Sequence, residues 1–288
     1  MITRRDCLKF TGAAALAGMS RTSAAGKLPV RFGAMQGSLA AKPSVEMFDV
    51  ARRVGLAGVE LNIGRVLAEG KLPLADAALQ KQYMEAARTN KLAIAGVVLD
   101  IFHVHGLKDD PAAPAFLPEG IAIAHAMQAG VLLMPFFGKN GLTNRSEMGR
   151  VADILKEHVG AAEKAGIQLG LENVISAEDN AWIMDRVGSR VLKVYYDVGN
   201  ATNSGGFDAP KEIRWLGGKR ICQIHIKDKE YMGEGKVNFT ECFRAVRDSG
   251  YKGYLNFETS APSGDKESDL RRNLAFARKT LQEVEAEA

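Results

Sequence analysis

The sequence predicts a (β/α)₈ (TIM) barrel, and three observations support this fold class. First, a helix-like run, a Gly or Asn, and then a short apolar strand recur along the chain, for example at 52–61, 86–99 and 162–169. Second, the strand-like runs are apolar almost throughout, which is typical of strands covered on both faces. Third, about 260 residues remain after a predicted leader, enough for eight strand–helix units. A doubly wound open sheet is the alternative, but no turn reads G-x-G-x-x-G, the motif of dinucleotide-binding sheets.

Each strand is predicted from an apolar run and each helix from an amphipathic pattern. The predicted strands are 30–35, 58–62, 94–99, 131–136, 169–172, 194–197, 221–225 and 254–258. The predicted helices are 44–54, 74–89, 120–129, 146–165, 177–186, 238–248 and 266–283. The sixth connection, 203–219, is rich in Gly and contains Pro210, so we expect only a short helix there. Helix ends are expected at Gly55, Asn90, Gly130, Gly166 and Gly250, where Gly or Asn takes the left-handed conformation.

The first 25 residues have the pattern of a twin-arginine export signal. Arg4 and Arg5 precede a weakly apolar stretch at 10–19, and small residues at 23–25 offer a cleavage point. We therefore expect residues 26–288 to form one exported catalytic domain, periplasmic or secreted. The leader carries a surplus of three positive charges, so the net charge of +4 falls to about +1 without it. This near-neutral balance gives no argument for nucleic-acid binding or for stable membrane association.

Metal-binding residue types end the last four predicted strands: Glu172, Asp197, His225 and Glu258. Their intervals of 25, 28 and 33 residues are close to the ~30 residues of one strand-plus-helix unit. Four successive parallel strands would bring these side chains to the same end of one barrel, where active sites of this fold lie. Three carboxylates and one imidazole favour a hard divalent cation, with Mn²⁺ expected first and Mg²⁺ or Co²⁺ as alternatives.

This arrangement predicts proton chemistry beside a carbonyl group. A divalent cation can stabilise the enediolate that forms when a C–H bond next to a carbonyl is broken. Glu172 and Glu258 come from well-separated strands, so we expect them to act as the acid/base pair while also binding the metal. Return of the proton to the same carbon would give epimerisation, and return to the neighbouring carbon would give aldose–ketose isomerisation. The residues do not distinguish the two outcomes.

Several motifs resemble those of the xylose-isomerase-like barrel superfamily and its sugar phosphate isomerase/epimerase branch. They are the segments 170–173 (GLEN), 197–200 (DVGN), 225–228 (HIKD), 233–239 (GEGKVNF) and 257–258 (FE). The resemblance covers the whole predicted mature chain. It implies that the four residues bind one metal ion and that Glu172 and Glu258 transfer protons.

Departures within this resemblance leave the branch open. Ketose 3-epimerases usually carry a His and an Arg where this chain has Asn200 and Tyr231, whereas Glu178 fits a substrate-contacting Glu of that branch. The branch of abasic-site endonucleases uses many His ligands, and the chain has only five His. An endonuclease is therefore disfavoured.

Six further residues are candidates for substrate binding: Lys227, Glu178, Glu60, Asn200, His103 and His105. Lys227 follows His225 by two residues, so it faces the same side of its strand and could hold a substrate oxygen. A salt bridge to Glu60 or Asp228 is its alternative role. Glu60 is expected at the rim of the second strand. His103 and His105 follow the third strand, where exposure to solvent is the alternative to lining the pocket.

The leading functional hypothesis is a metal-dependent isomerase or epimerase that acts on a small keto sugar through a metal-bound enediolate. A lyase or dehydratase acting on a keto sugar or 3-keto-glycoside is the first alternative, and export favours it. A non-catalytic exported carbohydrate-binding protein is the second. No Arg-rich or Gly-rich phosphate cradle is evident after strands seven and eight, which points to an unphosphorylated substrate. A homo-oligomer is possible by analogy with other barrels.

Overall fold

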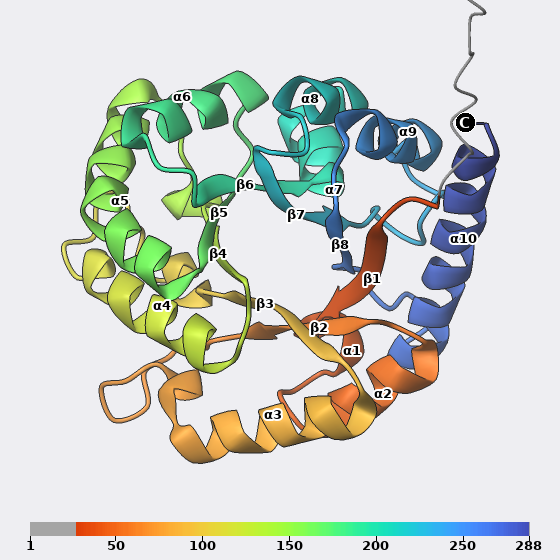
Figure 1. The fold of residues 1–288 in the computed structure, drawn as a ribbon, viewed down its shortest axis with the longest axis horizontal. Coiled ribbons are helices and arrows are strands. Elements are labelled where there is room, and N and C mark those ends of the chain that lie inside the picture. Colours follow the sequence, from red (N-terminus) through yellow and green to blue (C-terminus); the bar gives the residue numbers. More distant parts are fainter. Residues whose placement is uncertain (1–26, 288) are drawn as a thin grey trace, which may run out of the picture.

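The computed structural model describes residues 27–287 and contains a closed barrel of eight parallel strands in the order β1 to β8 (Figure 1). Register between β1 and β8, from Val30↔Gly253 to Ala34↔Phe257, closes the barrel and excludes the open-sheet alternative. The predicted export signal lies outside the described residues. The strands are β1 Val30–Met35, β2 Gly58–Asn62, β3 Ala93–Val98, β4 Val131–Pro135, β5 Gln168–Glu172, β6 Leu192–Asp197, β7 Ile221–Ile226 and β8 Gly253–Phe257.

Helices cover the outside of the barrel between successive strands (Figure 1). The longer ones are α2 Glu46–Val54, α3 Ala77–Asn90, α4 Phe116–Ala126, α5 Arg145–Ala165, α6 Ala177–Val187, α8 Ala209–Leu216, α9 Phe239–Ser249 and α10 Lys266–Ala286. Shorter turns lie in the loops, namely α1 Gln36–Leu39, η1 Pro73–Ala75, η2 Asp100–His103, η3 Ala113–Ala115, η4 Gly138–Asn140, α7 Val198–Asn200 and η5 Ala201–Gly205. The sixth connection contains the short helix that the sequence predicts.

The predicted left-handed caps are confirmed at Gly55, Gly166 and Gly250, with φ of 92°, 71° and 69°. The prediction is wrong at the other two positions: Lys91 (φ 56°) takes this conformation instead of Asn90, and Gln128 (φ 53°) instead of Gly130. Asn90 stays in the helix because its buried side-chain amide donates a hydrogen bond to Asp49.

The main apolar core lies between the strands and the helices, and a smaller cluster of strand residues forms a second one. The second cluster consists of Val98, Val131, Leu133, Tyr195 and Cys222. Cys222 and Cys242 are free and buried. Burial raises the pKa of both thiols to about 12, so neither is ionised near neutral pH.

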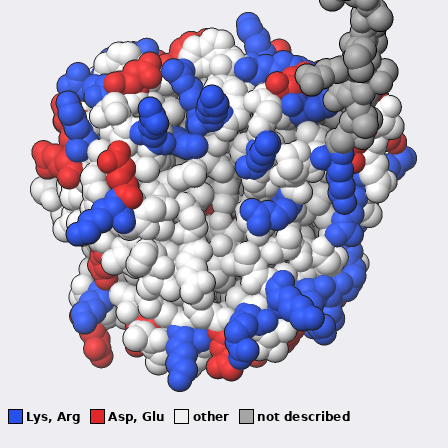
Figure 2. All heavy atoms as spheres, in the orientation of Figure 1, with Lys and Arg blue, Asp and Glu red and all other residues white. Residues whose placement is uncertain are grey.

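The surface in Figure 2 is the end of the barrel at which the strands begin. In Figure 1 the strands run clockwise from β1 to β8, and right-handed connections produce this order only when the amino ends face the viewer. Lys and Arg are spread among uncharged residues on this face, with Asp and Glu mostly near its edges (Figure 2). No helix among residues 27–287 combines the length and the apolar character needed to cross a bilayer. The carboxyl ends, where the predicted site lies, face the opposite way.

Candidate metal centre at the carboxyl ends of the strands

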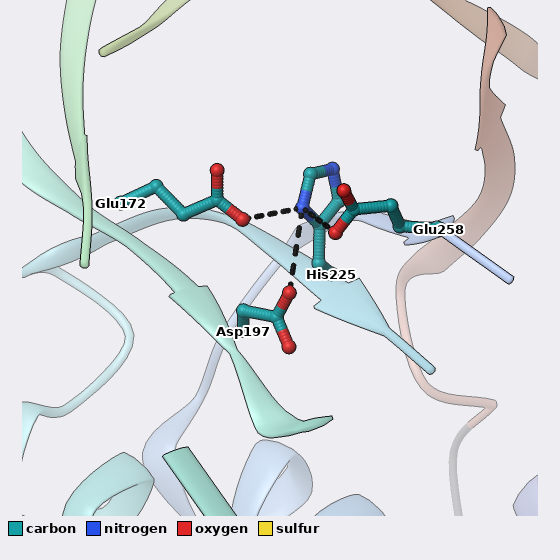
Figure 3. Close-up of side chains that lie close together, drawn as sticks. All are labelled: Glu172, Asp197, His225 and Glu258. Atoms are coloured by element: carbon teal, nitrogen blue, oxygen red, sulfur yellow. Dashed lines mark hydrogen bonds and ion pairs between the residues drawn. The ribbon is translucent and has the colours of Figure 1, made fainter. Parts of the chain in front are cut away.

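The four predicted ligands come together at the carboxyl end of the barrel. One ligand atom from each of Glu172, Asp197, His225 and Glu258 lies within 4.8 Å of the other three. Glu172 and Asp197 are the last residues of β5 and β6, His225 is the next-to-last of β7, and Glu258 directly follows β8. Asp197 and His225 are register partners, so the barrel itself sets their side chains next to each other. The three carboxylates point at the imidazole from different sides (Figure 3).

The imidazole of His225 is oriented by acceptors on both of its nitrogens. Nδ1 lies 2.8 Å from Oε1 of Glu172, 3.2 Å from Oε2 of Glu258 and 3.8 Å from Oδ2 of Asp197. Nε2 lies 2.7 Å from Oε2 of Glu60. When Nε2–H donates to Glu60, the Nδ1 lone pair points into the group of carboxylates. Nδ1 is therefore the atom that could bind a metal ion, with Glu60 as the outer carboxylate that fixes the tautomer.

Charge crowding shifts the pKa values of the cluster. Burial raises the pKa of Asp197 and raises that of Glu172 to about 7. Burial would do the same to Glu258, but the positive charges of His225 and Lys227 outweigh it and hold the pKa of Glu258 well below its ordinary value. Burial would lower the pKa of His225, yet the surrounding carboxylates raise it well above the ordinary value. The cluster thus requires compensating positive charge.

The donor set fits a divalent cation. Oδ2 of Asp197 is buried and accepts no hydrogen bond of good geometry, although the Lys227 ammonium lies 2.8 Å away. Such an atom has a lone pair left to bind a cation, and three carboxylates with one imidazole nitrogen suit a hard or borderline metal. These four residues could hold the ion from one side and leave the solvent side for a substrate.

A buried polar network lies beneath the metal centre, and sequence reasoning did not find it. The Tyr195 hydroxyl donates to Oε1 of Glu60 at 2.7 Å and lies 2.7 Å from Nδ2 of Asn256. Nδ2 of Asn256 also donates to Oε1 of Gln223 at 2.7 Å. Tyr195, Gln223 and Asn256 each precede a predicted ligand by two residues. Since strand side chains alternate between faces, this spacing puts each of them on the ligand's face, one step deeper in the barrel. That signal could have identified them.

Two glycines make room for this network. A Cβ at Gly33 would lie 2.2 Å from Oδ1 of Asn256, and one at Gly96 would lie 3.1 Å from Oε1 of Glu60. The clash at Gly33 is with a fully buried side chain that cannot move aside cheaply. At Gly33, β1 therefore packs against the network through its backbone alone.

Three of the predicted substrate-binding residues contact the cluster. The Lys227 ammonium lies 2.6 Å from Glu258 and 2.8 Å from Asp197, rather than against Glu60 or Asp228. The backbone N–H of Asn200 donates to Oδ1 of Asp197 at 2.8 Å. Glu60 is fully buried beneath His225 instead of lying at the rim, and both of its oxygens accept hydrogen bonds.

The other three predicted residues lie further from the cluster. His103 is half-buried in η2, and its ring stacks on Phe137 with centroids 6.1 Å apart. Nδ1 of His105 lies 2.6 Å from Oδ2 of Asp110, in a pair within one loop. Glu178 is exposed in the first turn of α6, and no hydrogen bond or ion pair of its side chain is found among residues 27–287.

The chain resembles known proteins in sequence. It is 28% identical over 215 residues to the 2-epi-5-epi-valiolone 7-phosphate 2-epimerase of Actinoplanes sp., covering 69% of this chain and 76% of that relative. It is 29% identical over 119 residues to an uncharacterised protein of Methanocaldococcus jannaschii, covering 36% of this chain and 41% of that protein. The chain thus matches less than half the length of the latter relative.

Solved structures share the fold. An L-ribulose 3-epimerase superimposes with a TM-score of 0.74 at 17% identity, covering 90% of this chain and 96% of that one. The D-psicose 3-epimerase of Clostridium cellulolyticum H10, solved with D-tagatose, gives 0.71 at 16% identity, with coverages of 87% and 99%. A family model described as the xylose isomerase-like TIM barrel matches residues 48–280, which contain all four candidate ligands. The chain therefore belongs to the xylose isomerase-like TIM barrel family.

Proposed function

We propose that this protein is a divalent-metal-dependent epimerase or isomerase that acts on a small keto sugar or a related ketone. The observation that carries the proposal is the convergence of three carboxylates and one imidazole within 4.8 Å at the mouth of the barrel. The names of similar proteins agree with it, since they include epimerases of ketoses and of a cyclitol phosphate.

Glu172, Asp197, His225 and Glu258 would hold the metal ion, for which we propose Mn²⁺ first because the donors are mostly carboxylate oxygens. A divalent cation bound there would supply stabilisation for the negative charge that develops on substrate oxygens. Lys227, whose ammonium lies between Asp197 and Glu258, adds a second positive charge on the same side.

Glu258 and Glu172 are the proposed proton-transfer pair. Their environments push their pKa values apart, below the ordinary range for Glu258 and up to about 7 for Glu172. This difference in the cation-free cluster favours Glu258 as the base and Glu172 as the acid, and a bound cation would lower the pKa of both carboxyl groups. The Glu258 carboxylate would remove the proton from the carbon next to the carbonyl, and the electron pair would move onto the carbonyl oxygen to give an enediolate. Glu172 would return a proton to the opposite face of the same carbon, which inverts it, or to the neighbouring carbon, which isomerises the sugar.

Deuterium uptake tests this proposal. The Mn²⁺-loaded wild type, incubated in D₂O with a panel of ketoses, keto-glycosides and inososes, should incorporate deuterium next to the carbonyl of at least one compound. Glu258→Gln and Glu172→Gln should slow this exchange by about 10²- to 10⁴-fold, the usual contribution of a positioned acid or base. Glu157→Gln, an exposed change on α5, should leave the rate unchanged. Wild-type exchange by Glu258→Gln would remove the assignment, and release of an aglycone would identify a lyase instead.

We further propose export through the twin-arginine route, which rests on the sequence pattern of residues 1–25 alone. A reporter fused behind these residues should leave the bacterial cytoplasm. Changing Arg4 and Arg5 together to Lys should keep it inside, as measured by cell fractionation. Unchanged export of the double variant would contradict a twin-arginine address.

A further inference from the structure

A cavity of about 350 Å³ lies beside the candidate metal centre, and its lining is basic on one side. It sits between the segments that follow β6 and β7, and it is lined by Gly199, Asn200, Asn203, Ser204, Lys227, Asp228, Lys229 and Lys236. Lys227 belongs to both sites, because its ammonium also contacts Asp197 and Glu258. A substrate whose reacting carbon lies at the metal centre could therefore extend into this cavity.

The charges at the cavity are not balanced. Lys229 and Lys236 are exposed, and no carboxylate within the described part of the chain lies within 4 Å of either ammonium. Arg214, which also follows β6, instead pairs with Asp248 and Glu241.

Asp228 is the one acidic residue in the lining, and its carboxylate already accepts hydrogen bonds from the backbone. It is buried and accepts hydrogen bonds from the backbone N–H groups of Lys229 at 2.9 Å and Val237 at 3.3 Å. These two bonds close the segment 229–237 into a loop, with one lysine at each end. Gly235 is required inside this loop because a Cβ there would lie 2.0 Å from Oδ1 of Asp228.

The rest of the lining consists of neutral residues rather than acids. It comes from α7 and η5, where Gly199, Asn200, Asn203 and Ser204 line the cavity. A cavity lining that combines lysines with amide- and hydroxyl-bearing residues matches the several acceptor oxygens of an anion.

We propose that this cavity binds an anionic substituent of the substrate, a phosphate or a carboxylate carried at the end of the keto sugar remote from the reacting carbon. The inference rests on the proposed function, because it assumes that a ketose occupies the metal centre. It departs from the sequence-based expectation of an unphosphorylated substrate. That expectation relied on the absence of an Arg-rich or Gly-rich cradle, whereas lysines bind anions as point charges and need no such pattern.

Three six-carbon ketoses that differ only at carbon 6 test the proposal: D-fructose, D-fructose 6-phosphate and D-fructuronate. Their binding to the Mn²⁺-loaded protein is measured by calorimetry. The wild type should bind one of the charged sugars at least about tenfold more tightly than fructose, since charge-assisted hydrogen bonds are the stronger class. The charged sugar that binds more tightly shows whether the cavity prefers a phosphate or a carboxylate. The double variant Lys229→Met/Lys236→Met should lose this preference. Lys219→Met/Lys252→Met should keep it, because these exposed lysines precede β7 and β8 at the other end of the barrel.

Equal binding of the three probes by the wild type, including no measurable binding of any, would overturn the proposal. So would a preference that survives in Lys229→Met/Lys236→Met. Deuterium exchange of the same sugars separates this result from the proposed function. A lysine-dependent preference, with no deuterium exchange of these sugars or of any compound in the ketose, keto-glycoside and inosose panel, keeps the anion site and removes the epimerase. Deuterium exchange into fructose, with the same sugar preference in the wild type and the lysine double variant, keeps the epimerase and removes the anion site.

Discussion

His225 shows how a single buried residue can prepare the metal centre. Its Nδ1 faces the carboxylates of the cluster, and its Nε2 lies 2.7 Å from Glu60. Glu60 is fully buried and is itself held by the Tyr195 hydroxyl at 2.7 Å. Neither the imidazole nor the carboxylate can turn without breaking a buried hydrogen bond, so the orientation of Nδ1 is fixed before any ligand arrives.

Replacing Glu60 with Gln should therefore weaken metal binding without removing a ligand. The amide keeps the shape of the side chain but loses the charge that makes the imidazole a stronger base. We expect the Kd for Mn²⁺ to rise by about tenfold to a hundredfold, the usual effect of losing an outer carboxylate. Titration of the folded variant, followed by the EPR signal of free Mn²⁺, measures this change. A Kd within a factor of two of the wild-type value, in a variant with native circular dichroism, would assign Glu60 a purely structural role.

At this scale the sequence predicted the residues that end strands but not those beneath them. Glu172, Asp197, His225 and Glu258 could be found because each follows an apolar run at a regular interval. Glu60 was singled out, but its place under His225 was not, because residue order along one strand does not tell which side chain of a distant strand it will meet. That pairing depends on the barrel's register, which only the closed structure provides.

Among the secondary-structure elements, α5 begins with a connected set of side-chain hydrogen bonds. Oδ1 of Asn144 accepts the N–H of Glu147, and the carboxylate of Glu147 accepts the N–H and hydroxyl of Thr143 and contacts the Lys108 ammonium at 3.1 Å. Burial would raise the pKa of Glu147, but these donors outweigh it and lower the pKa to about 2. The ionised carboxylate thus ties the loop after β3 to the start of α5.

This arrangement predicts a pH-dependent contribution to stability. The folded pKa of Glu147 is about 2 and lies below the ordinary value of 4.5, so its contribution is complete above about pH 4.5 and is lost as the pH falls towards 2. Glu147→Gln should lower the free energy of unfolding by about 1–2 kcal/mol at pH 7, and the difference from wild type should shrink below pH 4.5. Urea unfolding at pH 3, 5 and 7 measures it, with Glu157→Gln as the exposed control on the same helix. A difference that does not change with pH would contradict this role for the charge.

The sequence predicted elements well where periodicity is strong and poorly where it is absent. All eight strands and the short sixth helix were found. However, α3 begins at Ala77 rather than at 74, because Asp76 caps it by accepting the N–H of Leu79. α4 covers Phe116–Ala126 rather than 120–129 because Pro118 falls in its first turn, where proline is tolerated. The short turns η1 to η4 have no periodic pattern, and they were not predicted.

At the scale of the whole molecule, a cluster of buried charged side chains lies at one end of the closed barrel. Glu172 and Asp197 are buried there, and Glu258 is only partly exposed. Lys227 and His225 supply the neighbouring positive charge. A barrel scaffold tolerates this concentration because its apolar core, between strands and helices, lies away from the site.

Metal binding should therefore stabilise the entire fold, since a ligand that binds only the folded state adds to its stability by mass action. At a free Mn²⁺ concentration of 100 times Kd the gain is about 2.7 kcal/mol, which for a domain of this size corresponds to a rise in Tm of roughly 5–10 °C. Scanning calorimetry with EDTA and then with increasing Mn²⁺ measures this shift. Asp197→Asn should lose most of the shift, because it removes the charge of a buried ligand whose Oδ2 lacks a well-aligned hydrogen bond. Glu157→Gln should retain it. If wild type and Asp197→Asn respond equally to Mn²⁺, the ion stabilises the barrel from some other place, and these four residues do not form its binding site.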